Sequence, residues 1–143
     1  MLSRLVDALR KKTSREIQQN RERKSIYGRT ICHGVLVLAR TIDPETGRSV
    51  LYGRKLTGLT KGLERAGYYL TSWRLGDYYR TYPEYVEDET VKVLKERGDF
   101  LHGGSIWKPF VVEDGNLITA RYPEDAHLFA QKLVDRVKMN QGL

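Results

Sequence analysis

Residues 30–39, Thr-Ile-Cys-His-Gly-Val-Leu-Val-Leu-Ala, hold the single cysteine of this 143-residue chain and decide its fold class. Before the cysteine, residues 26–31 alternate in character, which predicts a short strand. After it, the apolar run at 35–39 is too continuous for a surface strand and predicts a buried helix entered through a tight turn. Cys32 is therefore expected where a strand ends and a helix begins, which is the arrangement of a nucleophile elbow.

Such an elbow predicts chemistry at Cys32. The sharp turn presents the side chain to substrate, and free backbone N–H groups after it can stabilise an oxyanion. The positive end of the following helix and any nearby imidazolium are expected to lower the pKa of the thiol. Gly34 permits close approach of the neighbouring backbone. The alternative is a buried and inert cysteine, the common fate of a lone cysteine between apolar residues.

The remaining pattern mixes strands and helices, which indicates an α/β layered domain. An Asp-Gly pair at 114–115 predicts a hairpin between the apolar runs at 110–112 and 117–119. Residues 50–52 and 54–57 are expected to be extended. Helices are expected at 2–12, within 58–67 and closed by Gly67, at 84–97 with Gly98 as C-cap, and from Pro123 onward. Residues 68–85, rich in tyrosine, are predicted to be a covering loop or an interface segment.

Three segments, in this order, resemble the ThiJ/PfpI family of the class I glutamine amidotransferase-like superfamily. Residues 30–39 resemble its Ala-Ile-Cys-His-Gly elbow. Residues 52–58, Tyr-Gly-Arg-Lys-Leu-Thr-Gly, resemble its Gly-Arg/Lys-Lys-Val-Thr strand. Residues 111–123, Val-Val-Glu-Asp-Gly-Asn-Leu-Ile-Thr-Ala-Arg-Tyr-Pro, resemble the segment before its last helix. The resemblance spans residues 26–137.

The resemblance implies a flavodoxin-like sandwich, usually dimeric, with Cys32 as nucleophile at the carboxyl end of the parallel strands. His33 matches the histidine that orients or activates the thiolate in several branches. Glu64 stands near the acid that some branches add, although an ordinary surface carboxylate is the simpler interpretation. The implied activities are glyoxalase, deglycase, or peptidase and amidase chemistry on a small carbonyl, amide or peptide substrate, together with stress-protective chaperone work. No cofactor is implied.

The chain departs from the family pattern at its beginning. Family members carry first strands, a glutamate and a glycine-rich loop before the elbow, and nothing in residues 1–24 resembles them. We therefore expect an apparently N-terminally truncated fold, with a basic helical segment at 1–24 and the ThiJ/PfpI-like domain at 25–143. An open strand edge would then favour a dimer. The alternative function is a catalytically impaired remnant that acts as a stress-protective or interaction module.

Composition limits the other possibilities. Charged residues make up 30% of the chain and apolar residues 40%, without a membrane-length apolar run. One cysteine and no secretory signal favour the cytoplasm. His102 and His127 lack ligand-spaced partners, so a metal site is not expected. The net charge of +7 is concentrated in residues 1–30, where nucleic-acid binding is a weaker alternative because Tyr27 is the single aromatic there.

Overall fold

The structure is a computed structural model that describes residues 28–78 and 83–141. The expected helix at 2–12 and the basic segment at 1–24 lie outside the described residues. The described helices and strands are β1 (Arg29–Ile31), α2 (Val35–Arg40), α3 (Lys61–Leu75), α4 (Val86–Val93), β2 (Val111–Asp114), β3 (Leu117–Ala120) and α5 (Ala126–Gln141), with short 3-10 turns at Cys32–Gly34, Arg97–Asp99 and Pro123–Asp125.

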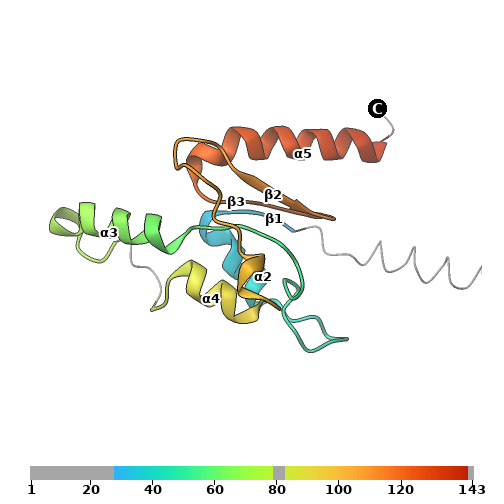
Figure 1. Cartoon of the computed structure of the whole chain (residues 1–143), viewed down its shortest axis with the longest axis horizontal. Coiled ribbons are helices and arrows are strands. Elements are labelled where there is room, and N and C mark those ends of the chain that lie inside the picture. Colours follow the sequence, from blue (N-terminus) through green and yellow to red (C-terminus); the bar gives the residue numbers. More distant parts are fainter. Residues whose placement is uncertain (1–27, 79–82, 142–143) are drawn as a thin grey trace, which may run out of the picture.

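The strands form a small mixed sheet in the order β1-β3-β2. β1 and β3 are parallel, with Thr30 opposite Thr119, whereas β2 and β3 form the antiparallel hairpin predicted around the Asp-Gly pair. Gly115 in that turn has φ +59°, the left-handed conformation that glycine adopts most easily. Helix α5 covers one face of the sheet, and α2 and α4 lie on the other (Figure 1). The described fold is mixed α/β, consistent with a flavodoxin-like arrangement.

The buried helix after the cysteine is confirmed. Val35, Leu36 and Ala39 are almost completely buried on α2, facing the core. All four residues of β3 are buried as well, as expected for the central strand of a sheet covered on both faces. The core cluster consists of Val35, Leu36, Ala39, Leu51, Leu56, Leu59, Val86, Leu94, Phe100 and Leu117, and Cys32 packs against it.

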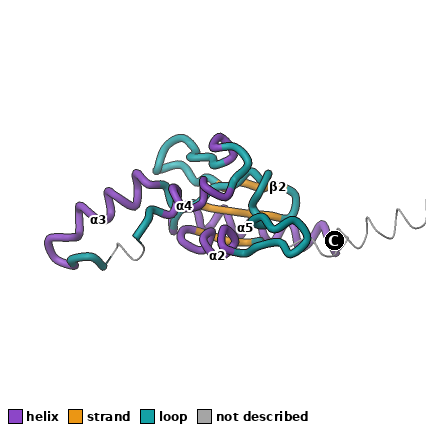
Figure 2. Tube along the Cα trace, turned by 90° about the horizontal axis from the view of Figure 1, so that it is seen from below, coloured by secondary structure: helices purple, strands orange, loops and turns teal. Residues whose placement is uncertain are grey.

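Helix α3 corrects two predictions. It does not close at Gly67 but continues to Leu75 and ends at Gly76, which has φ +56°. The Thr71 hydroxyl donates to the Gly67 carbonyl at 2.6 Å within the continuing helix. The expected covering loop at 68–85 is thus helical in its first eight residues. Figures 1 and 2 show α3 projecting away from the sheet, so its later turns expose Tyr69 and Trp73.

Two further predictions need correction. Helix α4 begins at Val86 rather than Glu84 and ends at Val93, because Leu94 turns into an extended conformation and is buried in the core. Gly98 is therefore no C-cap and lies in a separate 3-10 turn. Residues 50–52 form a turn rather than a strand. In the segment 54–57, Leu56 forms an isolated parallel bridge with Phe100, with backbone hydrogen bonds of 3.0 and 2.8 Å.

A buried ion pair fixes the loop that connects these layers. Arg121, directly after β3, is 1% exposed, and Asp125 is completely buried. The guanidinium donates to both Asp125 carboxylate oxygens, at 2.9 and 3.0 Å. Its remaining N–H groups donate to the carbonyls of His102, Ser105 and Lys108. The pair therefore anchors the loop at 102–108 beneath the start of α5.

Replacing Asp125 by Asn should destabilise the fold strongly, because it leaves a buried guanidinium without its counter-charge. Burial favours a raised pKa for Asp125, but hydrogen bonds from Arg121 and from the backbone of Phe110 and Arg121 hold this pKa below its ordinary value. Its ionised form therefore stabilises the fold at neutral pH, and this contribution is lost as pH falls through the lowered pKa. We expect a loss of about 3–5 kcal/mol in the free energy of urea unfolding at pH 7.

The matched control is Glu113→Gln, since Glu113 pairs with Lys132 and Arg136 at the surface. That change should cost less than about 1 kcal/mol. Equal losses for the two variants would show that the buried pair has no special structural role.

Candidate active site at the elbow

The backbone at Cys32 has the conformation that an elbow requires. Among the described residues, Cys32 is the one non-glycine with a positive φ, at 58°. The residue before it, Ile31, is extended, and Gly34 and Val35 after it are helical. The left-handed conformation costs a non-glycine residue on the order of 1–2 kcal/mol, so the surrounding packing must hold it.

Two glycines allow that packing. A Cβ atom on Gly34 would lie 2.4 Å from the Thr30 hydroxyl oxygen, closer than any real contact. A Cβ atom on Gly58 would lie 2.8 Å from the Val35 side chain and 3.6 Å from the Cys32 carbonyl oxygen. The Thr57 amide beside it donates to the Thr119 hydroxyl at 2.9 Å, which ties this loop to β3. The elbow is therefore clamped between β1 and the loop at 57–60.

The thiol lies beside the imidazole that follows it. Cys32 Sγ and His33 Nδ1 are 3.4 Å apart, within hydrogen-bonding distance for sulfur. Burial raises the pKa of the Cys32 thiol, a hydrogen bond from the His33 backbone opposes this rise, and the negative charge of Glu64 adds to it. The net direction is upward. The expectation of a lowered thiol pKa is therefore wrong, because desolvation outweighs the favourable hydrogen bond.

Glu64 is buried rather than a surface carboxylate, with 6% of the residue exposed. It lies in the first turn of α3, which begins after Thr60, whose side chain accepts the Leu63 amide at 3.4 Å. Glu64 Oε2 accepts the Val86 amide at 3.0 Å, and the carboxylate lies close enough to raise the pKa of the Cys32 thiol. The Glu64 carboxylate thus has a structural partner at the start of α4, and its charge is the smallest of the three influences on the pKa of the Cys32 thiol.

Glu87 and His102 were not predicted as site residues, but they form polar contacts beside the start of α3. Glu87 Oε2 accepts the amide of Lys61, the first residue of α3, at 2.8 Å. His102 Nε2 lies 2.8 Å from Glu87 Oε1. The acidic run at 87–89 does signal a helix start, but nothing in the sequence shows that its first member reaches another helix.

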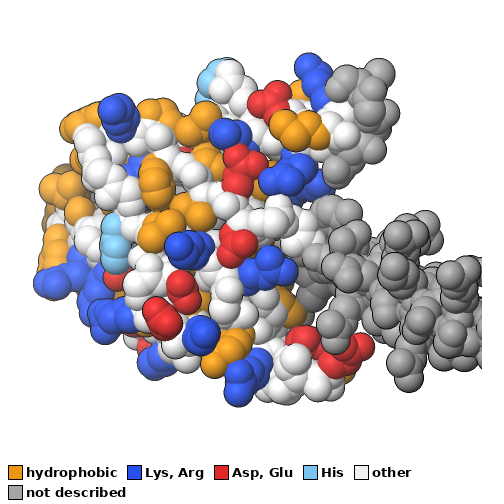
Figure 3. Space-filling view, turned by 45° about the vertical axis from the view of Figure 1, so that its right-hand side comes forward, with side chains coloured by type: hydrophobic (Ala, Val, Ile, Leu, Met, Phe, Trp, Pro, Cys, Tyr) orange, Lys and Arg blue, Asp and Glu red, His pale blue; other side chains and the backbone are white. Residues whose placement is uncertain are grey.

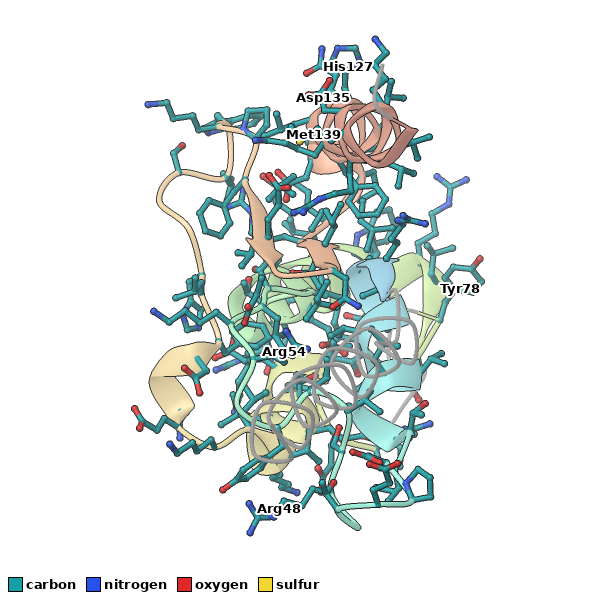
Figure 4. The ribbon with its side chains drawn as sticks, turned by 90° about the vertical axis from the view of Figure 1, so that its right-hand side faces the viewer. Arg48, Arg54, Tyr78, His127, Asp135 and Met139 are labelled. Carbon is teal, nitrogen blue, oxygen red and sulfur yellow. The ribbon has the colours of Figure 1, made fainter. Side chains whose placement is uncertain are left out.

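His127, the third histidine of the chain, lies on α5. His127 Nε2 is 3.0 Å from the side-chain nitrogen of Gln131 on the exposed face of α5. Figure 4 shows His127, Asp135 and Met139 projecting from α5 at one end of the molecule, while Arg48 projects at the opposite end. Across residues 28–78 and 83–141, no three His, Cys, Asp or Glu side chains gather as metal ligands would.

The described surface shows mixed charge. On the face in Figure 3, Lys and Arg side chains are interspersed with Asp and Glu rather than gathered into one basic patch. Arg40 pairs with Glu89, and Lys61 pairs with Asp88, both at 2.6 Å. None of the described helices combines the length and hydrophobicity that a membrane span requires.

The fold and the elbow define an α/β protein with one thiol at the carboxyl end of a parallel strand pair. No family model matches the chain. The chain is homologous to Glyoxalase 3 of Candida albicans, with 26% identity over 111 residues, and the match covers 77% of this chain and 43% of that protein. The chain thus spans less than half the length of this curated relative.

Solved structures share the fold. A crystal structure of a protein designated APC35852 matches with a TM-score of 0.59 and 27% identity, over 77% of this chain and 43% of the other. The 24 kDa Rapid Encystment Protein of Francisella tularensis matches at 0.53 and 28%, over 71% and 39%. Glyoxalase III from Candida albicans matches at 0.55 and 24%, over 73% and 41%, a likeness of fold.

The raised pKa of Cys32 predicts slow alkylation at neutral pH. Because the thiolate is the reactive form, the rate constant with iodoacetamide should rise with pH through and beyond the ordinary range of a thiol. The same chain in concentrated urea provides the control, since Cys32 is its single thiol. We expect native Cys32 to react more slowly than unfolded Cys32 at pH 7. A faster reaction in the native state would contradict the raised pKa.

Proposed function

We propose that this chain carries the catalytic segment of a ThiJ/PfpI-type glyoxalase that uses Cys32 on small 2-oxoaldehydes such as methylglyoxal. Homology to a glyoxalase supports the reaction class. The observation that carries the proposal is the Cys32 backbone at φ 58°, directly after a parallel strand and before a helix. A conformation that opposes stability is a mark of functional sites.

Thiol chemistry alone suffices for the reaction. Addition of the Cys32 sulfur to the aldehyde carbon gives a hemithioacetal, and the thiol proton leaves with a base. Transfer of the proton from that carbon to the neighbouring carbonyl carbon, with return of the thiol proton from the base to the oxygen on the second carbon, gives the thioester of a 2-hydroxy acid. Hydrolysis then releases the hydroxy acid and restores the thiol. Water is the one co-reactant, and no redox partner or cofactor is needed.

His33 is the base of this proposal. Its Nδ1 lies 3.4 Å from Cys32 Sγ, so it can take the thiol proton as the sulfur attacks. Because the pKa of the thiol is raised, the proton moves from Cys32 to His33 when substrate is bound and not in the resting protein. Glu64 accepts the Val86 amide at the start of α4, and backbone amides of the helical turn after Cys32 stabilise the oxyanion, where Gly34 permits close packing.

A second candidate is a catalytically impaired remnant that serves as a stress-protective or interaction module. One observation that favours it is the raised pKa of the Cys32 thiol, which favours the protonated and less reactive form. Large apolar side chains exposed on α3, including Leu70 and Trp73, would suit such a role. The weaker proposal of nucleic-acid binding through residues 1–30 depends on a segment mostly outside the described residues.

We also propose a cytoplasmic location, a homodimer, a flavodoxin-like sandwich at 25–143, and a basic segment at 1–24. Deglycase and peptidase or amidase activity remain alternatives within the cysteine-dependent class, because each also begins with attack by a thiolate.

The purified chain should convert methylglyoxal to lactate without added glutathione. Cys32→Ser should lower the rate of lactate formation by about 10³-fold or more, because the hydroxyl is a far weaker nucleophile. His33→Gln should lower kcat by about 10²-fold through loss of the base. Lactate is measured by an enzyme-coupled assay, with Gln131→Ala as a surface control of unchanged rate.

Equal lactate formation by wild type and by Cys32→Ser would refute the proposal. An inactive wild type that suppresses the aggregation of a denatured client protein would instead support the stress-protective module.

A further inference from the structure

Three buried threonines lie at the base of the elbow, on three different segments. Thr30 is on β1, Thr119 is on β3, and Thr57 is in the loop at 57–60. Thr30 and Thr119 are opposite each other in the parallel strand pair, so their side chains point to the same face of the sheet. That face is the one on which the elbow turns into α2, because a Cβ atom on Gly34 would meet the Thr30 hydroxyl.

The Thr119 hydroxyl anchors the loop at 57–60 to the sheet. It accepts the Thr57 amide at 2.9 Å in a buried hydrogen bond. The preceding residue, Leu56, is held by backbone bonds to Asp99 and Leu101, whereas Thr57 is held through a side chain. A buried amide that loses its acceptor destabilises the conformation that buries it. The position of the loop therefore depends on this one hydroxyl.

Gly58 brings the anchored loop into contact with the elbow. A Cβ atom on Gly58 would lie 2.8 Å from Val35 Cγ1 and 3.6 Å from the Cys32 carbonyl oxygen, so the glycine backbone packs against both residues. Val35 is the first residue of α2 and is completely buried, and Cys32 has the positive φ of 58°. A residue in this conformation must be held by its neighbours. Gly58 is such a neighbour, one residue beyond the bond to Thr119.

The Thr57 side chain shows that the amide makes this hold. Thr57 Oγ1 is buried and has no hydrogen-bond partner within residues 28–78 and 83–141. A buried hydroxyl without a partner opposes stability. The bond from the Thr57 amide to Thr119 therefore keeps the loop in place against an unfavourable contribution from the loop's own side chain.

We propose that Thr119 is a positioning residue for the thiol. Its hydroxyl holds the loop at 57–60 against Val35 and the Cys32 carbonyl, and so keeps Cys32 in the left-handed conformation at the end of β1. The catalytic meaning of this inference rests on the proposed function, whereas the positioning itself concerns the resting protein. Thr119 acts through the loop and not on the sulfur.

The titratable groups beside the thiol stay the same when Thr119 is changed. His33 Nδ1 lies 3.4 Å from Cys32 Sγ, and the charge of Glu64 has the smallest of the three influences on the pKa of the thiol. Burial has the largest influence on this pKa. Because threonine carries no charge, a change at Thr119 reaches the thiol through packing and hydration.

The experiment measures the rate of Cys32 alkylation by iodoacetamide against pH in the full chain. Thr119→Val keeps the shape of the side chain but removes the acceptor of the Thr57 amide. The released loop admits water to the elbow, which weakens the desolvation of the thiol. We expect the profile to move to lower pH by about half to one unit, which raises the rate constant at pH 7 by about threefold to tenfold.

Two further variants separate positioning from general damage. Thr119→Ser restores the hydroxyl, and its profile should return to that of wild type. Gly58→Ala displaces the loop by a different route, because its Cβ atom would press on Val35. Its profile should move in the same direction as that of Thr119→Val. Combining Gly58→Ala with Thr119→Val should add little to either shift, because the loop is already released.

The matched control is Ser49→Ala. Ser49 is buried, and its hydroxyl likewise accepts a loop amide, that of Leu51 at 3.2 Å. It lies near the carboxyl end of α2, where it donates to the Leu38 carbonyl at 3.2 Å. Ser49→Ala should unfold at lower urea concentration than wild type, yet its Cys32 profile should coincide with wild type. The same unfolding measurement checks that each variant is folded.

A kinetic readout applies where the wild type converts methylglyoxal. Thr119→Val should then lower kcat by about 10-fold to 100-fold with a smaller change in KM, because the thiol is no longer held in place for attack. Thr119→Ser should restore most of kcat.

The positioning is overturned if the Thr119→Val profile coincides with wild type, if Thr119→Ser moves as far as Thr119→Val, or if Ser49→Ala moves equally. Should Thr119→Val fail to fold, Gly58→Ala decides in its place. Predicted shifts in a chain without turnover would reject the proposed function and support the positioning. Turnover by wild type with unmoved profiles would support the proposed function and reject the positioning.

Discussion

The described structure depends on one backbone constraint, the left-handed conformation of Cys32 between β1 and the turn that leads into α2. A glycine would adopt it freely, whereas a cysteine must be held there by its neighbours. Thr30 lies below the turn and Val35 beside it, and the glycines at 34 and 58 leave room for both. The apolar side chains of α2 then anchor the turn in the core. The packing of these residues thus holds the Cys32 side chain at the end of β1 despite the unfavourable backbone conformation.

The same constraint sets the electrostatics of the site. A thiol packed against the core loses hydration, which favours its protonated form, and the nearby Glu64 charge acts in the same direction. Glu64 in turn is held by the amide of Val86 at the start of α4. Burial is the largest of these influences, so the reactivity of the resting thiol depends mainly on how the elbow packs against the core.

The secondary structure around Cys32 and the 111–120 hairpin were predictable from local sequence, whereas the extent of α3 and the electrostatics of the site were not. The strand, turn and buried helix around Cys32 follow from periodicity, and the 111–120 hairpin follows from its Asp-Gly pair. The extent of α3 does not, because Gly67 and Gly76 are equally plausible ends and only Gly76 adopts a positive φ. The pKa direction of Cys32 and the partners of Glu87 depend on burial and on contacts between distant segments, which periodicity does not encode.

The most direct test of the account compares the unfolding free energies of Cys32→Ala and Cys32→Gly in urea. If the elbow holds a left-handed residue at a cost, glycine relieves it, and Cys32→Gly should be about 1 kcal/mol more stable than Cys32→Ala. At an ordinary position glycine is the less stable of the two because of its greater freedom in the unfolded chain. A Cys32→Gly variant that is less stable than Cys32→Ala would contradict the account.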